Sequence, residues 1–183
     1  MIENSLNGSE KQLYNYQKGA IKQIFEKFES APNDYHLLYQ LPTGGGKTVI
    51  FSEIVRQYIE TQNKRVLIMT HRLELCKQTS KMLTSFNVDN KIIDSKANLD
   101  DQQNYKCFVA MVETLNNRLN DQALDITDIG LVIIDEAHYN SFTKLFKFFE
   151  NNFDMESFSN YVDKMRGAKV SSVYVIVCKI HIF

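Results

Sequence analysis

The residues best suited by type and spacing to do chemistry form one stretch, Leu41-Pro-Thr-Gly-Gly-Gly-Lys-Thr48. Three successive glycines carry no Cβ, so the backbone N–H groups of a tight turn can close around phosphate oxygens. Lys47 adds an ammonium that can reach the β- and γ-phosphates, and Thr48 offers a hydroxyl to Mg²⁺. The stretch predicts a loop that binds a nucleoside triphosphate through Thr43, Gly44, Gly45, Gly46, Lys47 and Thr48. Leu41 stands where the general pattern has glycine, and the simpler alternative is an ordinary glycine-rich turn before a helix.

A second cluster of reactive side chains, Ile133-Ile-Asp-Glu-Ala-His138, follows the clearest strand pattern of the chain. Acidic residues at the carboxyl end of a parallel strand lie where open α/β sheets bind their ligands. Asp135 can hold Mg²⁺, which prefers oxygen ligands, and Glu136 can orient and deprotonate a water that attacks the γ-phosphate. Alone, the pair could be solvated residues that cap a helix. Its position downstream of the glycine-rich loop favours the catalytic interpretation.

The elements that must position these residues alternate between strand and helix, which predicts an α/β fold with a mostly parallel sheet and helices on both faces. Expected helices cover residues 11–29, 48–60, 73–83, 115–119 and 142–149, and expected strands cover residues 35–40, 65–70, 91–94, 106–111 and 129–135. We expect one domain over residues 1–150. Residues 151–183 form an atypical tail whose β-prone end, residues 170–183, could add a strand.

Composition excludes several classes of protein. With 44% hydrophobic and 23% charged residues among 183, the chain has an ordinary globular balance. No apolar run is long enough for a membrane span, and the polar start is not a secretory signal. Three scattered cysteines form no metal or disulfide pattern, which favours reduced thiols and a cytoplasmic location. The net charge of −1 means that any nucleic-acid binding must come from local groups.

Four motifs together resemble the DEAH-type helicases of superfamily two, in particular relatives of the type III restriction helicase subunit. In chain order they are the phosphate loop, Thr70-His-Arg-Leu-Glu-Leu75, Met111-Val-Glu-Thr-Leu115 and Asp135-Glu-Ala-His138. The resemblance covers about residues 11–150 and implies the first of two RecA-like domains of a P-loop NTPase. In that family the first glycine of the loop is often replaced, so Leu41 is no objection.

The resemblance also implies roles for individual residues. Lys47, Asp135 and Glu136 would be catalytic, Thr48 and Asp135 would bind Mg²⁺, and His138 would couple the site to the facing domain. Gln17, next to Tyr16, would read the adenine of ATP, although position 14 is Tyr where many relatives carry Arg. Contacts with the nucleic-acid backbone would come from Thr70, His71, Arg72, Thr114 and Arg118. For these five residues the alternative is a plain loop or helix-start role.

The implied function is the ATP-binding domain of an ATP-dependent DNA helicase or translocase. The family's Ser/Thr-Ala-Thr coupling motif and its second domain are absent, so we expect a truncated form that hydrolyses ATP weakly or not at all. Three alternatives remain open: a catalytically silent nucleotide or nucleic-acid binder whose partner chain supplies the second domain, an RNA helicase fragment, or a non-functional remnant. Elements that contact only the backbone do not distinguish DNA from RNA.

Overall fold

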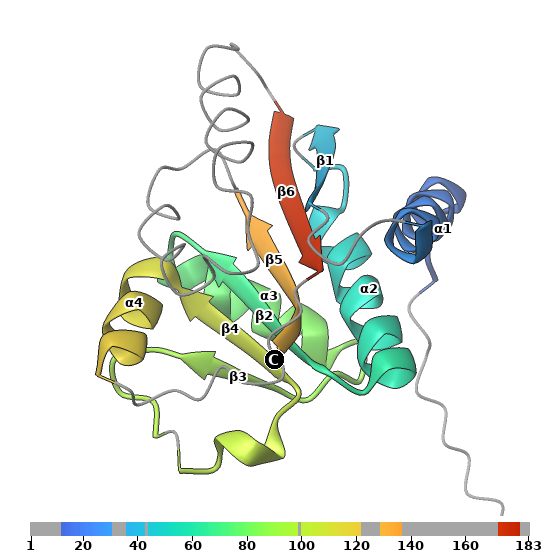
Figure 1. The fold of residues 1–183 in the computed structure, drawn as a ribbon. Helices are drawn as coiled ribbons and strands as arrows, with labels where there is room; N and C mark the ends of the chain where they lie inside the picture. The colour runs from blue at the N-terminus through green and yellow to red at the C-terminus, as the bar shows by residue number, and fades with distance from the viewer. Residues whose placement is uncertain are drawn as a thin grey trace, which may run out of the picture.

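The computed structural model describes residues 12–30, 36–42, 44–98, 100–121, 129–136 and 172–179, the last segment as backbone only. Thr43, His138 and the expected helix 142–149 lie outside the described residues. In chain order the elements are α1 (Asn15–Ser30), β1 (His36–Pro42), α2 (Lys47–Gln62), β2 (Arg65–Thr70), α3 (Leu73–Thr84), β3 (Asn90–Ile93), the 3₁₀ helix η1 (Gln102–Asn104), β4 (Cys107–Met111), α4 (Val112–Asn120), β5 (Ile129–Asp135) and β6 (Ser172–Lys179), as Figure 1 shows.

The strands form one sheet in the order β1-β6-β5-β2-β4-β3. Strands β2, β3, β4 and β5 pair in parallel, whereas β6 pairs antiparallel with both β1 and β5. Strand β1 therefore runs in the same direction as β5, and β6 alone opposes the other described strands. Strand β6 lies between β1, at one edge of the sheet, and β5 (Figure 1).

The composition of the central strands explains their burial. Every residue of β2 and every residue of β5 is buried, as expected for strands covered on both faces.

Right-handed crossovers place α2 and α3 on one face of the sheet, because the chain moves from β1 through β2 to β3 in one direction. The connection from β4 to β5 moves the opposite way, so α4 covers the other face. This arrangement confirms the expected mostly parallel sheet with helices on both faces.

The main hydrophobic cluster joins α1, α2 and α3 to one face of the sheet. Helix α1 contributes a stripe at helical spacing that consists of Ala20, Ile21, Ile24 and Phe28. Helix α2 contributes Ile50, Phe51, Ile54 and Val55, each at most 1% exposed. This packing matters for the site because α1 and α2 lie on either side of β1 in the chain, and the loop between β1 and α2 is the glycine-rich one.

Two further observations concern the elements expected from sequence. Strands β2 and β5 have the bounds that the apolar runs indicated, 65–70 and 129–135. Among the described residues, no helix has both the length and the apolar character needed to cross a lipid bilayer.

Candidate nucleotide site

The glycine-rich loop connects β1 to the first turn of α2 at the carboxyl edge of the sheet. Gly44 and Gly46 have φ angles of 81° and 73°, in the left-handed region that glycine adopts without strain. The loop closes through a hydrogen bond of 2.9 Å from the Gly45 N–H to the Pro42 carbonyl. Helix α2 begins at Lys47, so the amides of its first turn, which have no partner within the helix, lie beside the loop. The loop therefore has the local geometry of an anion site.

Lys47 joins this loop to the acidic pair at the end of β5. Its Nζ donates a hydrogen bond of 2.9 Å to Glu136 Oε1 and lies 3.5 Å from Asp135 Oδ1. The residues of the closer pair are 89 positions apart in the chain. They meet because β1 and β5 run in the same direction and end at the same edge of the sheet. The structure thus brings together the glycine-rich loop and the acidic pair, the two clusters to which the sequence analysis assigned the chemistry.

Burial perturbs the carboxyl group of Asp135. Asp135 is only 4% exposed, and this burial raises the pKa of its carboxyl above the ordinary value. The Lys47 ammonium lowers that pKa and the Glu136 carboxylate raises it, but burial has the largest effect. An ionised Asp135 is therefore costly without a nearby cation. Such a carboxylate is suited to bind a cation.

Glu136 has a backbone conformation that is uncommon for its residue type. Its φ angle is 59°, in the left-handed region, where an L-residue other than glycine costs about 1–2 kcal/mol. The chain turns here directly after β5, and the carboxylate lies within hydrogen-bond distance of Lys47. Strained residues of this kind cluster at functional sites, where the surrounding structure holds them in place.

The oxygen donors nearby suit a hard cation. Thr48 lies half-buried in the first turn of α2, directly after Lys47, and Asp135 supplies a buried carboxylate. Mg²⁺ typically takes one or two carboxylates and completes its shell with waters and substrate phosphates. The part of the chain that the structure describes holds no group of three or more His, Cys, Asp or Glu side chains arranged for a metal. The residues present fit a magnesium ion that binds together with a triphosphate.

The first turn of α1 also contacts the phosphate loop. The Tyr16 hydroxyl donates a hydrogen bond of 3.1 Å to the Gly45 carbonyl. Gln17 is 3% exposed, and its Oε1 accepts a hydrogen bond of 2.9 Å from the Tyr14 N–H, which caps the helix. A Cβ on Gly46 would lie 2.6 Å from Gln17 Nε2, so this side chain occupies the space beside the loop. The sequence suggested a role for Gln17 but not for the Tyr16 hydroxyl, because helical spacing does not reveal which side chain reaches a distant loop.

Residues 70–72, expected to contact nucleic acid, differ in their exposure. Thr70 is fully buried, and its hydroxyl contacts the Arg72 carbonyl at 3.1 Å and Cys76 Sγ at 3.0 Å. His71 is half-buried. Arg72 is exposed and directly precedes α3, at the same edge of the sheet as Lys47. Of these three side chains, Arg72 is therefore the one presented to solvent.

The second predicted pair lies on α4, where Thr114 and Arg118 are four residues apart and share one face of the helix. Arg118 Nη2 donates to three backbone carbonyls after β3, those of Asp94, Ser95 and Ala97, at 3.0–3.1 Å. This nitrogen therefore closes the loop after β3. The observation supports a structural role for Arg118, and its contact with nucleic acid stays a prediction.

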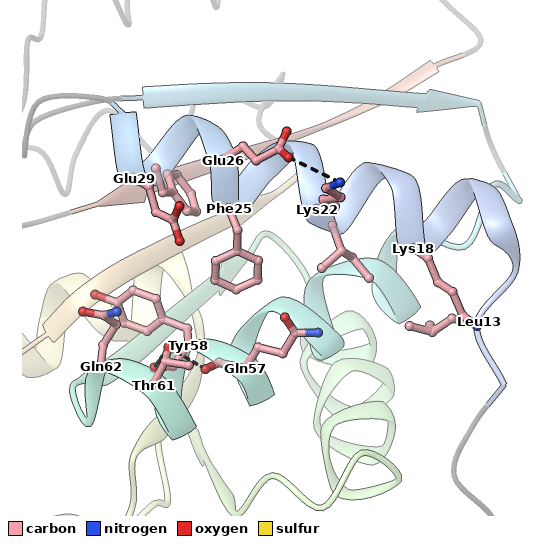
Figure 2. Close-up of a pocket in the computed structure, with 12 residues that line it drawn as sticks. Leu13, Lys18, Lys22, Phe25, Glu26, Glu29, Gln57, Tyr58, Thr61 and Gln62 are labelled. Carbon is pink, nitrogen blue, oxygen red and sulfur yellow. Dashed lines mark hydrogen bonds and ion pairs between the residues drawn. The ribbon is translucent and has the colours of Figure 1, made fainter.

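A groove of about 540 Å³ lies between α1 and α2 (Figure 2). Apolar side chains such as Ile21, Phe25 and Tyr58 line it together with charged ones such as Lys22 and Glu26. None of its lining residues belongs to the phosphate loop or to the acidic pair. The groove is thus separate from the candidate nucleotide site.

A mostly parallel sheet that brings a glycine-rich loop and its lysine to the acidic end of another strand is the arrangement of P-loop NTPase domains. The comparison with known families agrees. Residues 10–163 match the family described as type III restriction enzyme, res subunit. The chain belongs to this family, as a RecA-like domain of the superfamily-two helicase type.

Individual relatives are helicases by name. The chain is 35% identical over 135 residues to the yeast (Saccharomyces cerevisiae) protein named "Putative ATP-dependent helicase IRC3". The matched region covers 70% of this chain and 19% of that protein. It is 24% identical over 136 residues to the "ATP-dependent DNA helicase Hel308" of Thermoplasma acidophilum, which covers 72% of this chain and 19% of the relative. The chain therefore spans about one fifth of the length of these two relatives.

Solved structures share the fold. The UvsW helicase from bacteriophage T4 superposes with a TM-score of 0.59 at 21% identity, over 81% of this chain and 56% of that chain. The Hef helicase domain from Pyrococcus furiosus gives a TM-score of 0.53 at 21% identity, over 62% of this chain and 26% of that chain. At these identities the likeness supports the RecA-like fold.

Proposed function

We propose that this chain is the ATP-binding domain of an ATP-dependent DNA helicase or translocase and hydrolyses ATP with Mg²⁺. The observation that carries the proposal is the contact of Lys47 with both Asp135 and Glu136. A lysine in a glycine-rich loop and a carboxylate pair at a strand end are the parts that phosphoryl transfer to water requires.

The site residues divide the work as follows. The loop amides of Gly44, Gly45 and Gly46 and the Lys47 ammonium bind the β- and γ-phosphates and stabilise the charge that develops in the transition state. Asp135 and Thr48 would hold the magnesium ion, which supplies neutralisation of phosphate charge when bound.

Lys47 must change partners during this process. In the structure its ammonium donates a hydrogen bond to Glu136 Oε1 at 2.9 Å. A bound triphosphate competes for the same ammonium, and this competition releases the Glu136 carboxylate. The freed carboxylate can then accept the proton of the attacking water.

Nucleic acid and a second domain complete the proposal. Arg72, at the start of α3, is exposed and suits a contact with the phosphodiester backbone. DNA is favoured over RNA because one relative is named as a DNA helicase. In helicases of this family a facing domain supplies an arginine that stabilises the transition state. We therefore expect the chain alone to hydrolyse ATP slowly. A partner chain that carries such a domain would raise the rate.

Nucleotide titration tests the proposal directly. We expect the wild type to bind a fluorescent ATP analogue with Mg²⁺, and Lys47→Ala to weaken this binding by roughly 100-fold, because several charge-assisted hydrogen bonds are lost. Glu136→Gln should bind ATP at least as well as the wild type but show no turnover. Lys77→Ala, which removes an exposed lysine of α3, is the matched control. Equal affinity in the Lys47→Ala and wild-type proteins would refute the assignment.

An ATPase assay with single-stranded DNA, double-stranded DNA or RNA separates the remaining possibilities. Stimulation by DNA supports the helicase or translocase domain, and stimulation by RNA alone would replace DNA with RNA. Binding of ATP without turnover in any of these mixtures would favour the second candidate, a silent nucleotide-binding module. The observation in its favour is that Thr70 is buried and Arg118 Nη2 is engaged by backbone carbonyls.

A further inference from the structure

Tyr16 makes a contact with the phosphate loop that the proposed chemistry does not use. Its hydroxyl reaches across 29 chain positions to the Gly45 carbonyl at 3.1 Å. The residue is 52% exposed, so burial of the ring does not explain why it lies there. Its ring stacks nearly parallel to that of Tyr14, with the centroids 6.0 Å apart and an interplanar angle of 9°.

The loop needs such a contact because of its composition. Gly44, Gly45 and Gly46 have many backbone conformations available, and ordering them costs more entropy than ordering other residues. Two bonds restrain the middle glycine: its N–H donates to the Pro42 carbonyl at 2.9 Å, and its carbonyl accepts from Tyr16. If the Gly45 carbonyl rotated toward the phosphates, its oxygen would face the anion and weaken binding.

The base from which Tyr16 reaches the loop is itself well held. Gln17, the next residue, is 3% exposed and bonds the Tyr14 N–H at 2.9 Å, which fixes the first turn of α1. Ala20, Ile21 and Ile24 then anchor α1 in the core. The Tyr16 hydroxyl therefore belongs to a helix that is anchored in the core, and it restrains the conformation of the flexible glycine-rich loop.

We infer that Tyr16 is a positioning residue of the nucleotide site. Its hydroxyl turns the Gly45 carbonyl toward α1 and keeps the loop amides ready for phosphate before a nucleotide arrives. The inference rests on the proposed triphosphate site and adds that α1 contributes to binding of the phosphates themselves, independently of the base. Its effect is the same for ATP, for GTP and for inorganic tripolyphosphate.

The test removes one oxygen atom. Tyr16→Phe deletes the hydroxyl, and Tyr14→Phe deletes the hydroxyl of the adjacent stacked ring as the matched control. Isothermal titration gives the affinity of each protein for ATP, GTP and inorganic tripolyphosphate. We expect Tyr16→Phe to bind all three about two- to tenfold more weakly than the wild type, which is the range for one hydrogen bond, and Tyr14→Phe to bind them as the wild type does.

Three results would overturn the inference: unchanged affinity in Tyr16→Phe, an equal loss in Tyr14→Phe, or a loss for ATP alone, which would indicate a contact with the base. Amide hydrogen exchange in the nucleotide-free protein provides a second readout that does not depend on binding. Faster exchange at Gly45, Gly46 and Lys47 in Tyr16→Phe supports the inference, and unchanged exchange refutes it. If the wild type binds none of the three ligands, the proposed function fails, and the exchange experiment decides the role of Tyr16 in the loop.

Discussion

Asp135 and Glu136 are neighbours in the chain, yet their surroundings give them different properties. Asp135 belongs to a strand that is buried along its whole length and is 4% exposed, which raises the pKa of its carboxyl. Glu136 follows the strand in a left-handed conformation, and its side chain is 18% exposed. The buried carboxylate thus suits a cation, and the more accessible one suits a water molecule.

The cost of the buried Asp135 carboxyl to the stability of the fold can be measured. Because its folded-state pKa is raised, the buried carboxyl does not destabilise the fold at low pH, where it is protonated in both states. The cost builds up as pH rises from the unfolded-state pKa to the folded-state pKa, because only the unfolded chain is ionised in that window, and it is fully present above the folded-state pKa. We expect Asp135→Asn to melt about 2–4 °C higher than the wild type at pH 8, the shift that about 1 kcal/mol causes in a chain of this size, with little difference at pH 3.

Thermal unfolding by circular dichroism across this pH range provides the measurement. In the variant, Lys47 keeps its closer partner Glu136, so no buried ammonium is left alone. A gap between the two proteins that narrows as the pH rises would contradict the reasoning. The variant should also lose turnover of ATP, because Asp135 is the proposed magnesium ligand. A residue that is kept for function at a cost in stability shows this combination of effects.

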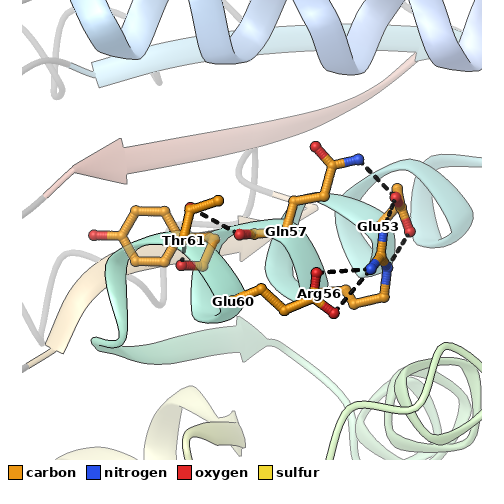
Figure 3. A network of polar contacts seen from close by, with 6 residues as sticks. Glu53, Arg56, Gln57, Glu60 and Thr61 are labelled. Carbon is orange, nitrogen blue, oxygen red and sulfur yellow. Dashed lines mark hydrogen bonds and ion pairs between the residues drawn. The ribbon is translucent and has the colours of Figure 1, made fainter.

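At the scale of the element, α2 carries the phosphate loop at its first turn and a network of charges on its middle turns (Figure 3). Glu53 is 6% exposed and accepts two hydrogen bonds from Arg56, at 2.8 and 2.6 Å, and one from Gln57 at 2.6 Å. Arg56 also donates to both oxygens of Glu60 at 2.8 Å. Burial would raise the pKa of Glu53, but the hydrogen bonds from Arg56 and Gln57 hold it below the ordinary value.

The two carboxylates of this network should differ in what they contribute. Glu53→Gln removes the buried partner of Arg56, and we expect it to lower the free energy of unfolding by about 1–2 kcal/mol at pH 7. Glu60→Gln is the matched control, since the Glu60 side chain is 60% exposed and such pairs contribute about 0–1 kcal/mol. Urea unfolding monitored by circular dichroism gives both values.

The pH dependence distinguishes this network from simple packing. Because the folded-state pKa of Glu53 is lowered, its contribution is present above the pKa of an unfolded glutamate and disappears as pH falls through the folded-state value. The difference between the wild type and Glu53→Gln should therefore shrink in acid. A difference that stays constant from pH 7 to pH 3 would show that shape, rather than charge, is responsible.

At the scale of the whole molecule, β6 determines how the two halves of the site are joined. Strand β1 carries the phosphate loop and β5 carries the acidic pair, and β6 pairs with both. Val175 lies opposite Tyr39 on one side and Asp135 on the other. Among the described strands, β1 has no other partner in the sheet. The distance from Lys47 to Glu136 thus depends on a strand that follows both motifs in the chain.

A single backbone change tests this dependence. Proline at position 175 cannot donate to the ladder and is poorly tolerated in an interior strand. We expect Val175→Pro to lower the free energy of unfolding by about 3 kcal/mol or more and to abolish nucleotide binding. Val175→Thr keeps the N–H and a β-branched side chain, so it serves as the control. Wild-type melting and ATP affinity in Val175→Pro would mean that β6 does not join β1 to β5.

Local pattern was enough to determine much of this protein. Continuous apolar runs identified β2 and β5 with their bounds, because a strand buried on both faces needs apolar residues throughout. The spacing of Ala20, Ile21 and Ile24 indicated α1, and Gly-Gly-Gly-Lys-Thr indicated a phosphate loop, because each pattern has a local physical cause. The acidic pair at the end of β5 was also recognisable from sequence.

Only the tertiary structure decided how distant segments meet. The interior, antiparallel place of β6 depends on pairing between strands far apart in the chain, which the β-prone pattern of residues 170–183 does not specify. The bond of Tyr16 to Gly45, the burial of Thr70 and the engagement of Arg118 depend likewise on which surfaces pack together. Composition and periodicity report a residue's preference for strand, helix or core, whereas contact between residues 29 or 89 positions apart is set by how the elements pack.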